Sequence, residues 1–146
     1  MDEPSLSVET APLREDLAVL EAGLSAHALP LTGAGGFEPL AVFSRDSARR
    51  IIGGAYGRTN WNWLHIHNVW VAEEERGKGL GRRLMLAIEA AAAERGCRYA
   101  HLDTFSYQAR PFYERHGYIL FAALEDYPPG HQRFFLRKVL GAARAG

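Results

Sequence analysis

The residues with the clearest chemical potential lie in a short glycine-rich and basic segment of this 146-residue chain. It combines alternate glycines with cationic side chains: Arg76, Gly77, Lys78, Gly79, Gly81, Arg82 and Arg83. Alternate glycines let the backbone turn tightly and approach a ligand, and a helix beginning there points unpaired N–H groups outward. The segment therefore predicts a site for a phosphate or pyrophosphate. A glycine-rich turn with solvated charges is the alternative.

Two common nucleotide-binding motifs fit this segment poorly. A P-loop requires serine or threonine after Gly-Lys and a glycine five positions earlier, whereas the chain has Gly79 and Ala72 at those positions. A dinucleotide fingerprint requires glycine where Arg82 stands, although Asp103 lies about where a ribose-binding acid is expected. A nucleotide-binding oxidoreductase is therefore the weaker alternative.

The first half of the chain predicts a helix followed by an antiparallel sheet. An amphipathic helix is expected from about Pro12 to just before Pro30, with leucines on one face. Strands are then expected over 40–43, 50–56 and 63–71, with a turn around Thr59-Asn60 between the last two.

The second half predicts one parallel crossover and a closing pair of strands. Strand 63–71, a helix over 80–95 and a strand over 98–105 form the crossover, which makes the two strands parallel. A short helix over 109–116 and strands over 118–124 and 132–139 follow. The expected fold is a single α/β domain over 1–146: a mixed sheet with an antiparallel opening meander, one central βαβ crossover and a C-terminal antiparallel strand pair. Residues 1–9 and 141–146 are expected to be loose termini.

The strand over 63–71 changes phase within its length. Leu64 and Ile66 occupy even positions, whereas the two valines that follow occupy odd positions. A strict two-residue repeat cannot place both pairs on one face, so one extra residue is predicted near His67 or Asn68, as in a β-bulge. A strand buried on both faces would give the same pattern.

Two motifs in this order resemble the signatures of the GNAT superfamily of N-acetyltransferases. The segment from Arg76 to Gly81 is similar to the [RQ]xxGx[GA] signature, and a Val-x-Val strand end precedes it, as in that family. Some thirty residues later, the segment from Ala109 to Tyr118 is similar to AxxFYxxxGF. The resemblance covers about 63–139. The chain departs from it at Ser106, where many members carry asparagine.

The resemblance implies a GNAT-like domain that uses acetyl-CoA as cosubstrate. The implied reaction transfers acetyl directly to a primary amine of a small molecule or peptide; the alternative is a domain that senses acyl-CoA without turnover. Tyr113 is expected beside the thioester sulfur. The residues expected to bind the coenzyme are Val69, Trp70, Val71, Arg76, Gly77, Lys78, Gly79, Leu80, Gly81, Arg82, Ser106 and Phe112.

The expected catalytic residues are Tyr113 and His67, but the base is less defined than the acid. His65 and His67 share one strand face and Asp103 ends the next strand, so each of them, or a water, can accept the amine proton. Ordinary sheet histidines are the alternative. No third ligand accompanies the two histidines at a diagnostic spacing, so no metal is expected. Glu125, Asp126 and His131 form a loop that can border the acceptor site or simply be solvated.

Composition excludes several other classes. Apolar residues make up 47% and charged residues 23%, as in globular domains, and 17 basic residues balance 17 acidic ones, which disfavours nucleic-acid binding. The single cysteine, Cys97, is expected to fill core space. The amino terminus lacks the pattern of a secretory signal, and no apolar run is long enough to span a membrane. A cytoplasmic monomer or homodimer is expected, with acetyl-CoA and an amine as its partners.

Overall fold

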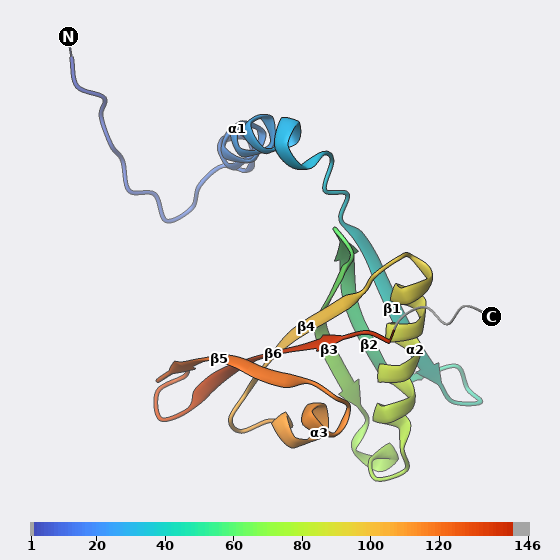
Figure 1. Cartoon of the computed structure of the whole chain (residues 1–146). Coiled ribbons are helices and arrows are strands. Elements are labelled where there is room, and N and C mark those ends of the chain that lie inside the picture. Colours follow the sequence, from blue (N-terminus) through green and yellow to red (C-terminus); the bar gives the residue numbers. More distant parts are fainter. Residues whose placement is uncertain (1, 142–146) are drawn as a thin grey trace. The chain divides into compact units, whose positions relative to one another are not determined.

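The computed structural model describes residues 2–141. Its contacts divide the chain into two compact units, with the boundary between Gly35 and Gly36. The first unit contains helix α1 and the second contains every strand and the remaining helices (Figure 1). Residues 2–9 form neither helix nor strand, and most of the predicted loose tail over 141–146 lies outside the described residues. Within residues 2–141, no helix combines the length and apolar character needed to cross a membrane.

Helix α1 (Arg14–Thr32) continues past the proline that was expected to end it. Pro30 lacks the N–H that would bond to the carbonyl one turn earlier, but it lies in the last turn, where only one bond is lost. The N–H of Gly33 donates to the carbonyl of Leu29 at 2.9 Å, and the Thr32 hydroxyl donates to the carbonyl of Ala28 at 3.1 Å. These bonds satisfy carbonyls at the helix end. The predicted end before Pro30 is therefore wrong.

The second unit is built on one mixed sheet of six strands, in the order β1-β2-β3-β4-β6-β5. The strands are β1 (Glu38–Arg45), β2 (Ile51–Asn60), β3 (Trp63–Val71), β4 (Tyr99–Phe105), β5 (Ile119–Glu125) and β6 (Gln132–Val139). Only β3 and β4 pair in parallel. The antiparallel meander, the single crossover and the antiparallel C-terminal pair are confirmed.

The turn between β2 and β3 lies two residues later than predicted. Thr59 and Asn60 pair with β3, and the turn is made by Trp61 and Asn62, whose φ values are 45° and 67°. The sequence pattern placed the turn at Thr59 because threonine and asparagine are polar, but Thr59 is buried in the sheet. The predicted position is therefore wrong, and β2 is longer than expected.

Helix α2 (Leu80–Glu94) provides much of the core on one face of the sheet. Its residues Leu84, Met85 and Ile88 are buried, together with sheet residues such as Leu64 and Leu136. Each buried side chain of this size stabilises the fold by about 1.5–3 kcal/mol. Cys97, just after the helix, is also buried in this core, as expected. The segment after β4 forms the short helix α3 (Arg110–Arg115), which leads into β5 (Figure 1).

The predicted β-bulge is present at His67. Tyr56 pairs with Asn68 and the next residue, Gly57, pairs with Ile66, so His67 has no partner in β2. A Cβ atom at Gly57 would overlap the carbonyl oxygen of His65, which explains why glycine stands opposite the bulge. The bulge bends β3 where its pairing with the neighbouring strand changes.

Strands β3 and β4 separate directly beside this bulge. Their parallel pairing runs from Trp63 opposite Tyr99 to Ile66 opposite Leu102 and then ends. The remainder of β3 keeps its pairing with β2 only. The carboxyl ends of the two parallel strands therefore diverge, which opens the sheet beside the glycine-rich segment that follows β3.

Candidate active site

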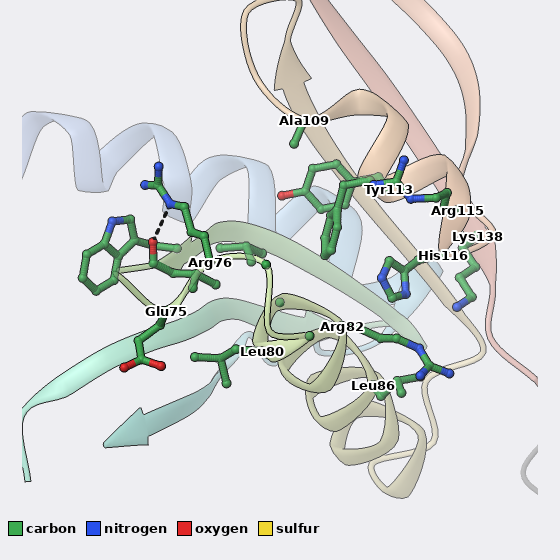
Figure 2. Close-up of a pocket in the computed structure, with 17 residues that line it drawn as sticks. Glu75, Arg76, Leu80, Arg82, Leu86, Ala109, Tyr113, Arg115, His116 and Lys138 are labelled. Atoms are coloured by element: carbon green, nitrogen blue, oxygen red, sulfur yellow. Dashed lines mark hydrogen bonds between the residues drawn. The ribbon is translucent and has the colours of Figure 1, made fainter. Parts of the chain in front are cut away.

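A cavity of about 950 Å³ lies where the two strands diverge. The end of β3, the glycine-rich loop with the start of α2, and helix α3 enclose it (Figure 2). Of the twelve residues predicted to bind the coenzyme, ten line this cavity: Val69, Trp70, Val71, Arg76, Gly77, Gly79, Leu80, Gly81, Arg82 and Phe112. Tyr113 lines it as well. Two segments some thirty residues apart in the sequence thus face one space.

The loop before α2 has the backbone geometry expected of an anion site. Gly77 and Gly79 adopt positive φ values of 78° and 82°, and a Cβ atom at either position would meet no protein atom within 4 Å. Gly79 precedes the first helical residue, and no side chain caps this helix end. The first N–H groups of α2 therefore have no side-chain acceptor, and the positive end of the helix dipole lies beside the cavity.

Gly81 serves close packing instead of a turn. A Cβ atom there would lie 3.2 Å from the ring of Phe112 and 3.8 Å from Val71. Glycine thus lets the first turn of α2 approach both α3 and the end of β3. This contact holds the two walls of the cavity together.

Basic side chains from three parts of the chain surround the cavity: Arg76, Arg82, Arg115, His116 and Lys138. Burial lowers the pKa of His116, so the positive charge comes from the arginines and the lysine. Figure 2 shows Arg115 and His116 on the α3 side and Arg82 on the opposite wall. Arg76 donates from Nε to the carbonyl oxygen of Val71 at 3.1 Å. Lys78 does not line the cavity; its Nζ lies 3.6 Å from Glu75 Oε2.

Three of these basic residues were not predicted. Arg115 and His116 lie inside the second signature, at positions where the motif allows any residue. Lys138 enters from β6, because β6 inserts beside β4. Nothing in the local sequence indicates that strand order. Glu75, Leu86 and Ala109 also line the cavity without having been predicted.

A buried carboxylate fixes Lys138 and α2. Glu89 accepts a hydrogen bond from the Tyr118 hydroxyl at 2.7 Å and one from Lys138 Nζ at 2.8 Å. Both carboxylate oxygens therefore have donors, as a buried charge requires. Burial, followed by the charge of Glu89, raises the pKa of Tyr118, so the phenol remains a donor. The network joins the middle of α2 to Tyr118, which precedes β5, and to Lys138 of β6.

Tyr113 is half-buried and projects from α3 into the cavity (Figure 2). Its ring meets Phe112 edge-on at 5.1 Å between centroids and Tyr118 at 6.2 Å. Burial raises the pKa of the Tyr113 hydroxyl, and the negative charge of Asp103 raises it further. The phenol is therefore protonated at neutral pH and can donate a hydrogen bond to an anion that forms beside it.

The other predicted catalytic residue, His67, does not line the cavity. It belongs to a group of three imidazoles on β3 and β4: His65 lies 4.0 Å from His67 and 4.2 Å from His101 between ring centroids. Burial, and then the neighbouring imidazoles, lower the pKa of His65 to about 4. Burial also lowers the pKa of His67 and of His101. All three rings are therefore neutral at pH 7, and His67 stands at the bulge.

Asp103 and Ser106 take part in contacts near the end of β4. Asp103 Oδ2 accepts a hydrogen bond from Arg133 Nε at 2.8 Å. Ser106 does not line the cavity; its Oγ accepts from the N–H of Gln132 at 3.0 Å and lies 3.3 Å from His131 Nδ1. Among residues 2–141, no cluster of histidine, cysteine, aspartate and glutamate has the arrangement to hold a metal ion.

Known proteins are similar to this chain in both sequence and architecture. The model of the acetyltransferase (GNAT) family matches residues 25–118. A blasticidin-S acetyltransferase from Streptomyces morookaense is 39% identical over 112 residues, which are 76% of this chain and 82% of that protein. A crystal structure of an acetyltransferase from Bacillus cereus superposes with a TM-score of 0.83 at 31% identity, covering 92% of this chain and 98% of that one.

A more distant relative has been solved with the coenzyme. It is a streptothricin acetyltransferase of Bacillus anthracis, in complex with acetyl coenzyme A. It superposes with a TM-score of 0.61 at 20% identity, over 69% of this chain and 62% of that one. At this identity the similarity concerns the fold alone.

Proposed function

Because the chain belongs to the GNAT family of acetyltransferases, we propose that its cavity binds acetyl-CoA and that Tyr113 assists transfer of the acetyl group to a primary amine. The chain is an acyltransferase, and acetyl-CoA is its acyl donor. One observation carries the assignment of the site: the uncapped start of α2 and the hydroxyl-bearing ring of Tyr113 line the same cavity, at the point where β3 and β4 separate.

The anionic part of the coenzyme belongs at the glycine-rich loop. The backbone N–H groups of Gly77 to Arg82 suit the pyrophosphate, because they lie at a helix N-terminus with cations around them. The pantetheine arm carries amide groups, and the part of β3 beyond Ile66 has no strand partner on the β4 side. The backbone of Val69 and Val71 suits those amides. This arrangement directs the thioester toward the gap between the strands.

The reaction needs a neutral amine. An alkylammonium has a pKa of about 10.4, so it must lose a proton before attack. The nitrogen lone pair then forms a bond to the thioester carbonyl carbon, and the carbonyl oxygen becomes an oxyanion. Its collapse breaks the C–S bond. The products are the amide, the coenzyme thiol and one proton released from the ammonium.

Tyr113 suits the departing sulfur. The free thiol has a pKa near 8.5, so the thiolate leaves readily and needs stabilisation more than full protonation. A tyrosine with a raised pKa is a weak acid but a competent hydrogen-bond donor. We therefore assign the hydroxyl of Tyr113 to the developing negative charge on the sulfur.

His67 is the proposed acceptor of the ammonium proton. It lies at the bulge, where the strands begin to separate, and its ring is neutral at pH 7. Because His67 does not line the cavity, its contact with the amine runs through the gap, directly or by way of water. Asp103 is the second candidate, but Arg133 already occupies one of its oxygens.

The acceptor that we propose is an amine of an antibiotic, and blasticidin S is the first compound to test. The support is the 39% identity to an enzyme named for that acetylation. We place the reaction in the cytoplasm, where acetyl-CoA is available and the unpaired Cys97 would stay reduced.

A panel of amines incubated with acetyl-CoA tests this function. Blasticidin S, an aminoglycoside and a lysine-containing peptide would each be added to the protein while free thiol is followed, and mass spectrometry would identify acetylated product. Blasticidin S should release thiol at a rate that depends on amine concentration. A reaction without amine measures hydrolysis. Coenzyme binding without thiol release for any amine would show a sensing domain and would overturn the proposal.

A further inference from the structure

Three aromatic side chains at the end of β4 form a surface that the coenzyme cavity does not include: Phe105, Tyr107 and Tyr127, here called the aromatic platform. The ring of Phe105 lies 5.4 Å from that of Tyr107 with 6° between their planes. It lies 6.0 Å from that of Tyr127 with 17° between their planes. The three rings are therefore nearly parallel.

The platform is exposed. Tyr107 keeps 57% of its surface accessible and Tyr127 keeps 46%. Single exposed apolar side chains are common, but a group of aligned rings in one place is an indication of a binding surface. Tyr107 lies two residues after the end of β4 and Tyr127 lies in the β5–β6 connection, so two separate segments contribute to it.

Polar contacts hold these rings in place. Arg133 donates from Nη1 to the Tyr127 hydroxyl at 3.1 Å, and its guanidinium lies 5.6 Å from the Phe105 ring centroid and 5.0 Å from that of Tyr127. His131 meets the ring of Tyr107 edge-on at 5.1 Å. The Tyr127 N–H donates to the carbonyl of His131 at 3.1 Å, which closes the turn. The surface is thus preformed, which reduces the entropy lost on binding.

Asp103 connects the platform to the reaction centre. It stands two residues before Phe105 and directly after Leu102, where the parallel pairing ends, so it borders the gap between the strands. Its carboxylate pairs with Arg133 at 2.8 Å. After burial, the charge of Asp103 also contributes to the raised pKa of Tyr113.

The ring faces and their charged neighbours favour an electron-poor or cationic ligand. Asp103 forms an ion pair with Arg133 and so balances its charge, and Asp126 adjoins Tyr127 in the chain. Parallel aromatic faces attract another flat ring by stacking, and they attract positive charge through their negative faces. An aliphatic amine can use only the charge, whereas a ring-bearing amine can use both.

We propose that the aromatic platform binds a planar conjugated ring of the acceptor, so that the enzyme selects primary amines joined by a short chain to an aromatic or heteroaromatic ring. This inference rests on the proposed function and specifies its acceptor class. The amine of such a molecule points toward the gap beside Asp103, while its ring lies against Tyr107 or Tyr127.

Two amines with the same ethylamine chain test it: 2-phenylethylamine, which has a flat aromatic ring, and 2-cyclohexylethylamine, which has a saturated ring. Each would compete with the best acceptor of the amine panel, and mass spectrometry would follow the acetylated product of that acceptor, because a competing amine that is itself acetylated also releases thiol. We expect the planar amine to have the lower inhibition constant by about three- to tenfold, as stacking energies of aromatic pairs predict. Tyr107→Leu keeps an apolar side chain but removes the flat face, and it should bring the two inhibition constants close together.

The control is Trp61→Leu, which removes an aromatic ring of similar exposure from the turn between β2 and β3. This turn precedes β3, whereas the gap lies toward the other end of that strand. Trp61→Leu should leave the preference for the planar amine unchanged.

The failure of this inference differs from failure of the proposed function. Equal inhibition by the two amines, no inhibition by either, or a preference that survives in Tyr107→Leu would overturn the platform assignment while acetyl transfer stands. A protein that acetylates no amine at all would overturn both.

Discussion

At the scale of single residues, the surroundings of Tyr113 decide what its hydroxyl can do. The ring is packed between Phe112 and Tyr118, and burial together with the charge of Asp103 keeps the hydroxyl protonated. A tyrosine at the same point of a short helix, but exposed to water, would be an ordinary surface residue. The packing of α3 against the core thus turns a common side chain into a fixed donor.

Substitution of Tyr113 separates catalysis from packing. Tyr113→Phe keeps the ring and removes one hydroxyl, so the fold should change little. If the hydroxyl stabilises the leaving sulfur, kcat should fall by about one to three orders of magnitude while acetyl-CoA affinity stays near that of the unaltered protein. Turnover with the best amine and calorimetric titration of the coenzyme measure the two effects.

The matched control for this substitution is Tyr99→Phe. Tyr99 stacks on Trp63 at the opposite end of β4, 4.8 Å between centroids, and does not line the cavity. The Tyr99→Phe variant should retain full turnover. An unchanged kcat in Tyr113→Phe, under conditions where chemistry limits the rate, would remove Tyr113 from the mechanism.

At the scale of elements, the loop before α2 does two things with the same residues. Gly79 ends the loop in a left-handed conformation, which starts the helix, and it leaves the backbone uncovered on the cavity side. Gly96 has a similar φ of 93° at the other end of α2, but it does not line the cavity. The two glycines therefore share one conformational demand and differ in their position relative to the proposed ligand.

This pair allows backbone strain to be distinguished from loss of a binding surface. Gly79→Ala and Gly96→Ala should each destabilise the protein by about 1–2 kcal/mol, because alanine is disfavoured at positive φ. Only Gly79→Ala places a methyl group over the backbone that the pyrophosphate would approach. The affinity of Gly79→Ala for CoA should fall about tenfold or more, as expected for losing a charge-assisted hydrogen bond.

Calorimetric titration of both variants with CoA provides the measurement, and chemical denaturation reports their stability. Equal CoA affinities in the two variants, with equal losses of stability, would exclude this loop as the phosphate site.

At the scale of the whole molecule, the three neighbouring imidazoles of His65, His67 and His101 make stability depend on pH. The folded state holds the pKa of His65 near 4, whereas an ordinary histidine has a value near 6.5. Between these values the unfolded chain binds more protons than the folded one, so the free energy of unfolding decreases as pH falls. The contribution of His65 is complete above about pH 6.5 and is lost progressively toward pH 4.

Urea denaturation at a series of pH values tests this linkage. The slope of stability against pH between about 6.5 and 4 should be smaller in His65→Phe than in the unaltered protein, because phenylalanine keeps an aromatic ring that cannot be protonated. A residual slope is expected, since burial also lowers the pKa of His67 and His101. A full slope in His65→Phe would show that His65 contributes no linkage.

The sequence by itself determined the features that depend on residues close together in the chain. The phase change around His67 predicted the bulge, because side chains alternate strictly along a strand. The bounds of β3 and β6 and the start of α2 agree with their patterns, since periodicity and glycine conformation are local properties. The two signatures likewise identified most of the cavity lining in advance.

The tertiary structure decided what depends on strand order. Lys138 reaches the cavity, and Arg133 reaches Asp103, only because β6 lies between β4 and β5 in the sheet. If β5 were the neighbour of β4, β6 would lie at the edge of the sheet. His101 joins the imidazole stack because the parallel register sets it opposite His65. Such contacts join residues thirty or more positions apart, and their energies depend on which strand edges meet. The strand order cannot be predicted from the periodicity of residues along the chain, so only the packed sheet shows it.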